Sequence, residues 1–227
     1  MLGVLKKILK WIVVVFFAST ILSVVLLRWV PVWFTPLMFI RVAQQSSQDK
    51  ELTLHHHWVS LKKISPSLPL AVMASEDAHF LEHHGFDFKA IETAAIRNMK
   101  HPEKHKHGAS TITQQTAKNV FLWPGRSWVR KGFEVYFTVL IELMWSKERI
   151  MEVYLNSIEM GDGIYGADAV AQYHFGTTAD QLSRAQCALI AVSLPNPRKM
   201  NSASPSKYML RRQQRILREM RYVKPLP

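Results

Sequence analysis

Hydrophobic residues form one long segment near the start of the chain and shorter, interrupted segments after it. Residues 11–27 are uncharged and almost wholly apolar, and residues 29–33 extend this segment past Arg28. A helix of this length can cross a bilayer, with the Arg28 side chain reaching back to the headgroups. Lysines precede the segment and aromatic residues follow it, so we expect an anchor whose N-terminus is cytoplasmic. A cleaved signal peptide is the alternative, but the segment is long for one and no Ala-x-Ala site follows it.

The rest of the chain carries apolar residues at the spacing of single helix faces. Sustained alternation of apolar and polar residues, the pattern of a strand, is missing after Thr53. We therefore expect an all-α domain over residues 46–227, preceded by a cytoplasmic N-terminus, anchor and linker over residues 1–45. The expected helices span residues 67–75, 87–99, 108–119, 127–145, 146–156, 187–194 and 205–222.

Capping residues and apolar spacing define the first two helices of this domain. Ser67 can cap the first of them, and Asp87 can cap the second. For the helix after Asp87 the spacing predicts a buried face made of Phe88, Ile91, Ala94 and Ala95.

The charge balance narrows the class of partner. The chain has 29 Lys and Arg against 17 Asp and Glu, a formal net charge of +12. Such a balance indicates a polyanion: nucleic acid, an anionic membrane surface or a phosphorylated substrate. A domain held outside the membrane argues against nucleic acid and for a lipid-linked anion. The single cysteine, Cys187, lies in an apolar run and predicts a buried thiol, with neither a disulfide nor a cysteine-based zinc site.

Residues 75–87 concentrate four carboxylates and three histidines between a short apolar helix and a glycine turn. Glu76 and Asp77 fall at the C-terminal end of that helix, where the helix dipole disfavours anions. A carboxylate in such a place suits a general base or acid. The stretch by itself fits a solvated helix end equally well.

Two further stretches are unusually polar or basic. Residues 108–119 form a glycine turn into a helix N-terminus, a place where free N–H groups bind anions. There Gln114 and Lys118 share one face, with Gln115 beside them. In the next helix Arg130 and Glu134 are four residues apart, and Arg126 and Lys131 lie close by. This group is either a surface salt bridge or one charged wall of a site.

In this order, these stretches resemble the motifs of glycosyltransferase family 51. The first two are Glu-Asp-x-x-Phe-x-x-His-x-Gly at residues 76–85 and Gly-Ala-Ser-Thr-Ile-Thr-Gln-Gln at 108–115, followed by Lys118 and Asn119. The stretch that resembles the third motif is Arg130-Lys131-x-x-Glu134. The stretch that resembles the fourth is Lys147-x-x-Ile150-x-x-x-Tyr154-Leu155-Asn156, and the one that resembles the fifth is the apolar helix that ends in Leu194-Pro195-Asn196-Pro197. Five ordered motifs over about residues 60–200 are far more specific than any one of them.

The resemblance implies a lysozyme-like helical fold and polymerisation of lipid II into β-1,4-linked glycan strands, with release of undecaprenyl pyrophosphate. No penicillin-binding transpeptidase sequence follows, so we expect a monofunctional enzyme of a Gram-negative inner membrane with its domain in the periplasm. The partners implied are lipid II, the growing glycan strand, the membrane and other cell-wall synthesis or division proteins, not nucleic acid. Apolar residues would let the domain dip into the headgroup layer, and Phe121, Leu122 and Trp123 are the candidates.

The resemblance also implies roles for individual residues. Glu76 would be the general base for the acceptor 4-hydroxyl, and Glu134 would support the donor pyrophosphate, with a divalent cation such as Mg or Mn as an option there. The remaining substrate contacts would come from Asp77, His83, Ser110, Thr111, Gln114, Gln115, Lys118, Asn119, Arg126, Arg130 and Lys131. Ala78 stands where family members often carry a basic residue, and Phe133 replaces a lysine found in some. Pyrophosphate binding would then depend more on Lys118, Arg126 and Arg130.

Two other functions fit parts of the pattern. A muramidase or lytic transglycosylase can share the helical scaffold and a catalytic glutamate. Such a hydrolase has no pyrophosphate to neutralise, so the basic stretches and the anchor favour synthesis. A non-catalytic membrane-anchored scaffold would have no use for Glu76 or Glu134.

Overall fold

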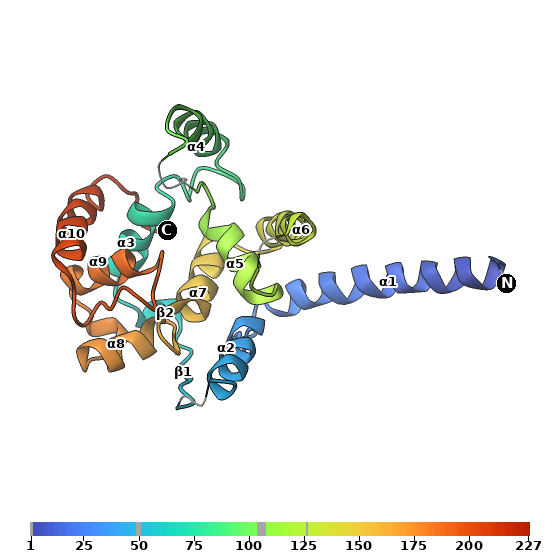
Figure 1. Cartoon of the computed structure of the whole chain (residues 1–227), viewed down its shortest axis with the longest axis horizontal. Coiled ribbons are helices and arrows are strands. Elements are labelled where there is room, and N and C mark those ends of the chain that lie inside the picture. Colours follow the sequence, from blue (N-terminus) through green and yellow to red (C-terminus); the bar gives the residue numbers. More distant parts are fainter. Residues whose placement is uncertain (1, 49–50, 104–107, 126) are drawn as a thin grey trace.

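The computed structural model describes residues 2–48, 51–103, 108–125 and 127–227. Helix α1 (Leu2–Leu26) extends away from the body of the molecule (Figure 1). It is long and apolar enough to cross a membrane, and its most apolar part is almost entirely exposed. This helix agrees with the predicted anchor.

The body of the molecule is built from short helices. The α-helices are α2 (Pro36–Ser46), α3 (Ser67–Glu76), α4 (Phe88–Lys100), α5 (Ile112–Phe121), α6 (Trp128–Met144), α7 (Lys147–Ser157), α8 (Ala167–Phe175), α9 (Arg184–Ser193) and α10 (Lys207–Glu219). Two 3₁₀ turns, η1 (Leu61–Lys63) and η2 (Ala179–Gln181), connect them. The predominantly helical architecture expected from the apolar spacing is therefore confirmed.

A small three-stranded sheet is the one departure from helices in the described residues. β1 (His55–His56) pairs in parallel with β3 (Ile164–Tyr165), which pairs antiparallel with β2 (Glu159–Gly161). Strands of two or three residues are too short to show an alternating pattern, so the sequence did not indicate them.

The core joins two groups of helices. Helix α9 packs against α3 and α10, and α5 packs against α6 and α7. Buried side chains from both groups, such as Val72, Tyr154 and Ile190, belong to one continuous hydrophobic cluster. Burial raises the pKa of the Cys187 thiol to about 11, as expected for the inert cysteine that the sequence predicted.

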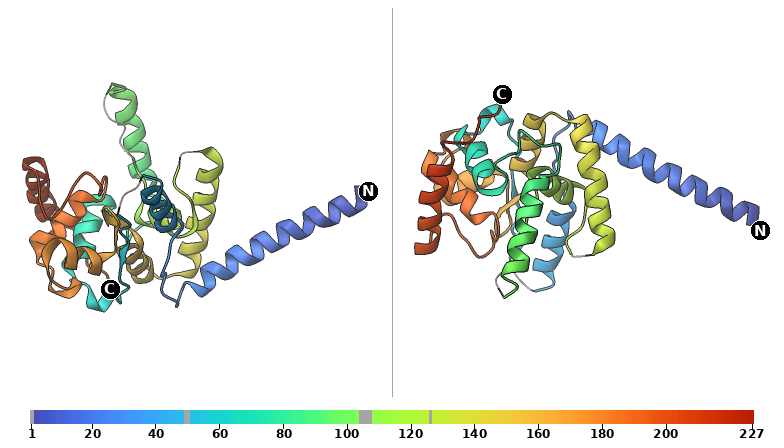
Figure 2. Two further views of the ribbon diagram at one scale, coloured as in Figure 1. Left: turned by 60° about the horizontal axis from the view of Figure 1, so that its bottom comes forward. Right: turned by 90° about the horizontal axis from the view of Figure 1, so that it is seen from above.

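Two local predictions for the domain are wrong. Helix α4 projects from the body (Figure 2) and buries none of its residues; Phe88 is 75% exposed. Its apolar spacing therefore marks a face without a partner in the described part of the chain. Helix α3 begins at Ser67 itself, after Pro66, and Ser67 makes no capping hydrogen bond. Asp87 does cap α4, because its carboxylate accepts a hydrogen bond from the Ala90 N–H at 2.8 Å.

The end of α1 is fixed to the body by hydrogen bonds to α6 and the residues that follow it. The Thr20 and Tyr136 hydroxyls lie 2.9 Å apart, and the Trp145 indole N–H donates to the Val24 carbonyl at 2.8 Å. Arg149 donates to the Leu27 carbonyl at the same distance. The direction of α1 relative to the domain is therefore set by specific contacts.

Replacing Gly166 with alanine should destabilise the fold by about 2 kcal/mol or more. Gly166 has φ +86°, and a Cβ added there would lie 2.7 Å from the Asn156 carbonyl oxygen. Gly132 lies inside α6 with open space around it. Its replacement by alanine should stabilise the protein by about 0.5–1 kcal/mol. Thermal or denaturant unfolding of both variants measures the difference, and equal effects would contradict the strain assigned to Gly166.

Candidate active site

Glu76 is the last residue of α3 and opens onto a cavity of about 580 Å³. We call this cavity the Glu76 pocket; its walls come from the end of α3, from α4 and from residues 108–111. The Gln115 amide donates to one carboxylate oxygen of Glu76 at 3.0 Å, and the Ser75 hydroxyl donates to the other at 3.4 Å. The carboxylate is thus held by two neutral donors, without a direct ion pair in the described residues. A carboxylate in this setting is free to accept a proton.

A second cavity of about 350 Å³ is lined in part by Gln115. We call it the Lys118 pocket; Arg41, Gln115, Lys118 and Arg130 are among the residues that line it. The amide nitrogen of Gln115 bonds Glu76, and its oxygen accepts from the Tyr154 hydroxyl at 3.3 Å. Gln115 therefore connects the two pockets, because it lines the Lys118 pocket and hydrogen-bonds Glu76 in the wall of the other.

Cationic side chains gather around Glu134 beside this pocket. Arg130 lies 3.3 Å from one Glu134 carboxylate oxygen, and Lys131 contacts the other. Burial lowers the pKa of Lys118; Glu134 opposes this shift, and Arg130 and Lys131 add to it. Lys118 has no ion-pair partner of its own among the described residues. The cluster holds three cations against one carboxylate, so its excess positive charge can bind an anion.

Several residues of the sequence motifs build the start of α5 instead of lining its exposed face. The Asp77 carboxylate accepts from the Ile112 N–H at 2.9 Å and contacts His83 Nε2 at 2.8 Å. Thr111 and Gln114 form a capping box at the N-terminus of α5. Gln114 lies one turn before Lys118 in α5, as predicted, but it is buried in that box and lines neither pocket, so a substrate contact by Gln114 stays a prediction. Gln115 lines the Lys118 pocket instead.

Replacing Asp77 with asparagine should lower stability by about 1–3 kcal/mol. The change removes the charge that faces His83 and the N-terminus of α5, and this carboxylate is buried. The melting temperature measures the effect. An unchanged melting temperature with lost activity would place Asp77 among the substrate contacts.

The other candidate residues do not all lie in one pocket. Ser110 and Thr111 line the Glu76 pocket, whereas Asn119 is buried in the wall of the Lys118 pocket. Ala78 is exposed and lines the Glu76 pocket, where it offers no charge. Arg126 lies outside the described residues.

Arg41 and Glu159 are wall residues that the sequence did not reveal. They approach each other at 3.5 Å in the Lys118 pocket. Burial raises the pKa of Glu159, and Arg41 opposes that shift. The two residues are 118 positions apart, so no local pattern could have paired them.

The residues around Glu134 do not fit a resident divalent cation. Arg130 and Lys131 already occupy its carboxylate, and Lys118 adds a further positive charge. Among the described residues no group of three His, Cys, Asp or Glu is arranged to hold a metal ion. Mg²⁺ in proteins binds oxygen ligands, and a surrounding of cations repels it.

Comparison with known proteins shows the family. A family model described as Transglycosylase matches residues 44–221. The chain is 63% identical over 226 residues to a biosynthetic peptidoglycan transglycosylase of Bacteroides thetaiotaomicron, covering 98% of this chain and 90% of that protein. It is 54% identical over 211 residues to one from Bdellovibrio bacteriovorus, covering 92% and 84%. The chain therefore belongs to the peptidoglycan transglycosylases of glycosyltransferase family 51 and is a peptidoglycan glycosyltransferase with a lysozyme-like helical fold.

Proposed function

We propose that this enzyme polymerises lipid II, with the donor pyrophosphate in the Lys118 pocket and the acceptor sugar in the Glu76 pocket. The observation that carries the proposal is the junction at Gln115, which bonds Glu76 and also lines the pocket of Lys118 and Arg130. A proton acceptor and a cationic surface are thereby placed on adjacent cavities. A synthetic glycosyl transfer from a lipid pyrophosphate needs both.

The chemistry assigns one task to each pocket. Glu76 removes the proton from the acceptor 4-hydroxyl as that oxygen attacks the anomeric carbon of the donor. The bond from this carbon to the pyrophosphate oxygen breaks, and the electron pair leaves with undecaprenyl pyrophosphate. Direct attack inverts the anomeric centre and converts an α-linked pyrophosphate into a β-1,4 linkage.

Charge neutralisation is the main requirement of the leaving group, because a pyrophosphate is already a weak base. Lys118 and Arg130 supply it from the walls of the pocket, and Glu134 holds Arg130 and Lys131 in place. In this arrangement Glu134 is a positioning residue. The side chains do the neutralising that a metal ion would otherwise provide.

The surface of α6 supports a membrane-facing orientation of the site. Trp128, Val135, Val139 and Leu143 fall on one face of this helix, and all are exposed. Helix α6 lies on the side of the body from which α1 leaves (Figure 2). Of the three residues that the sequence suggested for membrane contact, Trp123 is exposed, whereas Leu122 is buried and Phe121 stacks on Phe137. We propose that α1 anchors the enzyme with its N-terminus cytoplasmic and that the α6 face enters the headgroup layer of the inner membrane.

A glycan-cleaving enzyme is the alternative on the same scaffold. The cation cluster argues against it, because cleavage of a finished glycan strand releases no pyrophosphate for Lys118 and Arg130 to neutralise. Incubation of the detergent-solubilised protein with labelled lipid II tests the proposal. We expect polymer and undecaprenyl pyrophosphate; cleavage of finished sacculi with no polymer would contradict it. A parallel reaction with a chelator shows whether the side chains suffice or whether a cation accompanies the substrate.

A further inference from the structure

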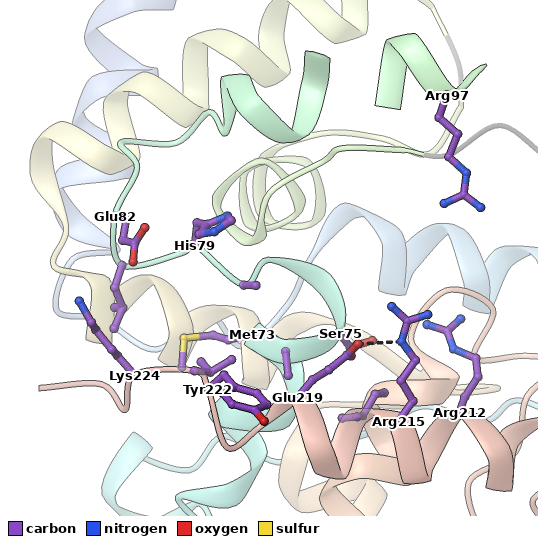
Figure 3. A pocket seen from close by; sticks show the side chains of 15 residues that line it. Met73, Ser75, His79, Glu82, Arg97, Arg212, Arg215, Glu219, Tyr222 and Lys224 are labelled. Atoms are coloured by element: carbon purple, nitrogen blue, oxygen red, sulfur yellow. Dashed lines mark hydrogen bonds and ion pairs between the residues drawn. The ribbon is translucent and has the colours of Figure 1, made fainter. Parts of the chain in front are cut away.

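A groove of about 710 Å³ continues from the Glu76 pocket along helix α10. We call it the arginine groove; the charged residues that line it are Glu82, Arg97, Arg212, Arg215, Glu219 and Lys224. It shares Ser75, Arg97 and Arg215 with the Glu76 pocket, so the two cavities adjoin. Figure 3 shows Arg97 pointing from α4 toward the guanidinium groups of Arg212 and Arg215 on α10.

These arginines have hydrogen-bond donors to spare. Arg215 uses its Nε on Glu219 at 2.7 Å, and Arg212 reaches the Tyr208 hydroxyl only at 3.5 Å. Arg97 has no side-chain partner among the described residues. Four cations and two carboxylates line the groove, and one of those carboxylates is already paired. Guanidinium groups with open donors match carboxylates in a bidentate geometry.

The substrate carries two kinds of anion, the pyrophosphate and the peptide carboxylates, and the position of the groove indicates which of them it can bind. Helix α10 lies at the opposite end of the body from α1 (Figure 1). A pyrophosphate joined to a membrane lipid stays near the membrane, so it cannot reach the arginine groove. The peptide branch of the acceptor disaccharide also carries carboxylates, and its free end can extend away from the lipid-linked end of the sugar.

We propose that the arginine groove binds the carboxylates of the peptide carried by the acceptor disaccharide. The proposal rests on the proposed function, because it places the acceptor sugar in the Glu76 pocket. Arg97, Arg212 and Arg215 orient the acceptor by its peptide branch, while its 4-hydroxyl remains at Glu76. The groove is thereby a specificity site for the peptide and takes no part in bond breaking.

Equilibrium binding of a soluble probe tests this assignment apart from catalysis. The probe is the peptidoglycan disaccharide–pentapeptide without pyrophosphate or lipid, measured by calorimetry or NMR on the full chain. Arg212→Gln/Arg215→Gln should weaken its binding about tenfold. Arg211 and Arg218 lie on the same helix, are exposed and do not line the groove. Arg211→Gln/Arg218→Gln removes the same charge and should leave binding unchanged.

A second probe, with its peptide carboxylates converted to amides, should bind the wild type as weakly as the first probe binds Arg212→Gln/Arg215→Gln. Equal loss in both double variants, equal binding of both probes, or no binding to the wild type would overturn the proposal. Polymerisation of lipid II by the wild type is measured separately. If the enzyme polymerises lipid II but probe binding does not depend on the groove arginines, this inference alone is contradicted. If the enzyme binds the probe but makes no polymer, the proposed function alone is contradicted.

Discussion

Replacing Glu76 with glutamine should reduce the rate of glycan polymerisation by about 10²–10⁴-fold, the usual contribution of a general base. Glutamine keeps the size of the side chain and can still accept the hydrogen bond from Gln115. It cannot take the proton of the acceptor hydroxyl. The fold and the binding of lipid II should therefore survive, which unfolding and equilibrium binding measure beside the polymerisation rate.

Glu92→Gln is the matched control for this variant. Glu92 is an exposed residue of α4 that lines neither pocket, so its replacement should leave the rate unchanged. A Glu76→Gln enzyme that elongated lipid II at the wild-type rate would remove Glu76 from the reaction.

Replacing Lys118 with methionine should weaken donor binding by about ten- to a hundredfold while leaving the protein as stable as the wild type or more so. Burial and the neighbouring Arg130 and Lys131 disfavour the charged amine, although Glu134 favours it. Methionine fills a similar volume without that electrostatic cost. Loss of function with gained stability is the signature of a charge placed for a ligand.

The pH dependence of stability tests the same point. The pKa of Lys118 in the folded protein is below its ordinary value of 10.5, so the unfolded chain binds more protons between the two values. The unfavourable contribution of Lys118 is complete below the folded-state pKa and fades as the pH rises toward 10.5. The stability of the wild type should therefore rise as the pH approaches 10.5. In Lys118→Met this rise should disappear, which melting curves of both proteins over a range of pH would show. Lys62→Met, at an exposed position, is the control. Equal losses of stability and activity in Lys118→Met would indicate that Lys118 has a structural role.

Local signals made most of the helices predictable. Ser127, Ser146 and Ser183 cap α6, α7 and α9, at or close before the predicted starts of these helices, because capping depends on residues within one turn. The same holds for Glu76 and Asp77, which end α3 as expected. The family motifs then placed Lys118 and Arg130 beside one pocket.

Features set by distant contacts were not predictable from local patterns. The apolar spacing of α4 gave no sign that its face would remain exposed, because packing depends on elements far along the chain. Spacing alone could not tell that Gln114 would turn back to cap α5 while Gln115 reached Glu76. Arg41 contributes to the Lys118 pocket because α2 packs against α5, a contact between distant segments that no local motif indicates.

The roles of the two pockets can be tested directly by a structure with a non-reactive lipid-linked pyrophosphate sugar and an acceptor disaccharide bound together. We expect phosphate oxygens within hydrogen-bond distance of Lys118 and Arg130, and the acceptor 4-hydroxyl within hydrogen-bond distance of the Glu76 carboxylate. Phosphates bound away from these cations, or an acceptor hydroxyl that faces a different side chain, would contradict these roles.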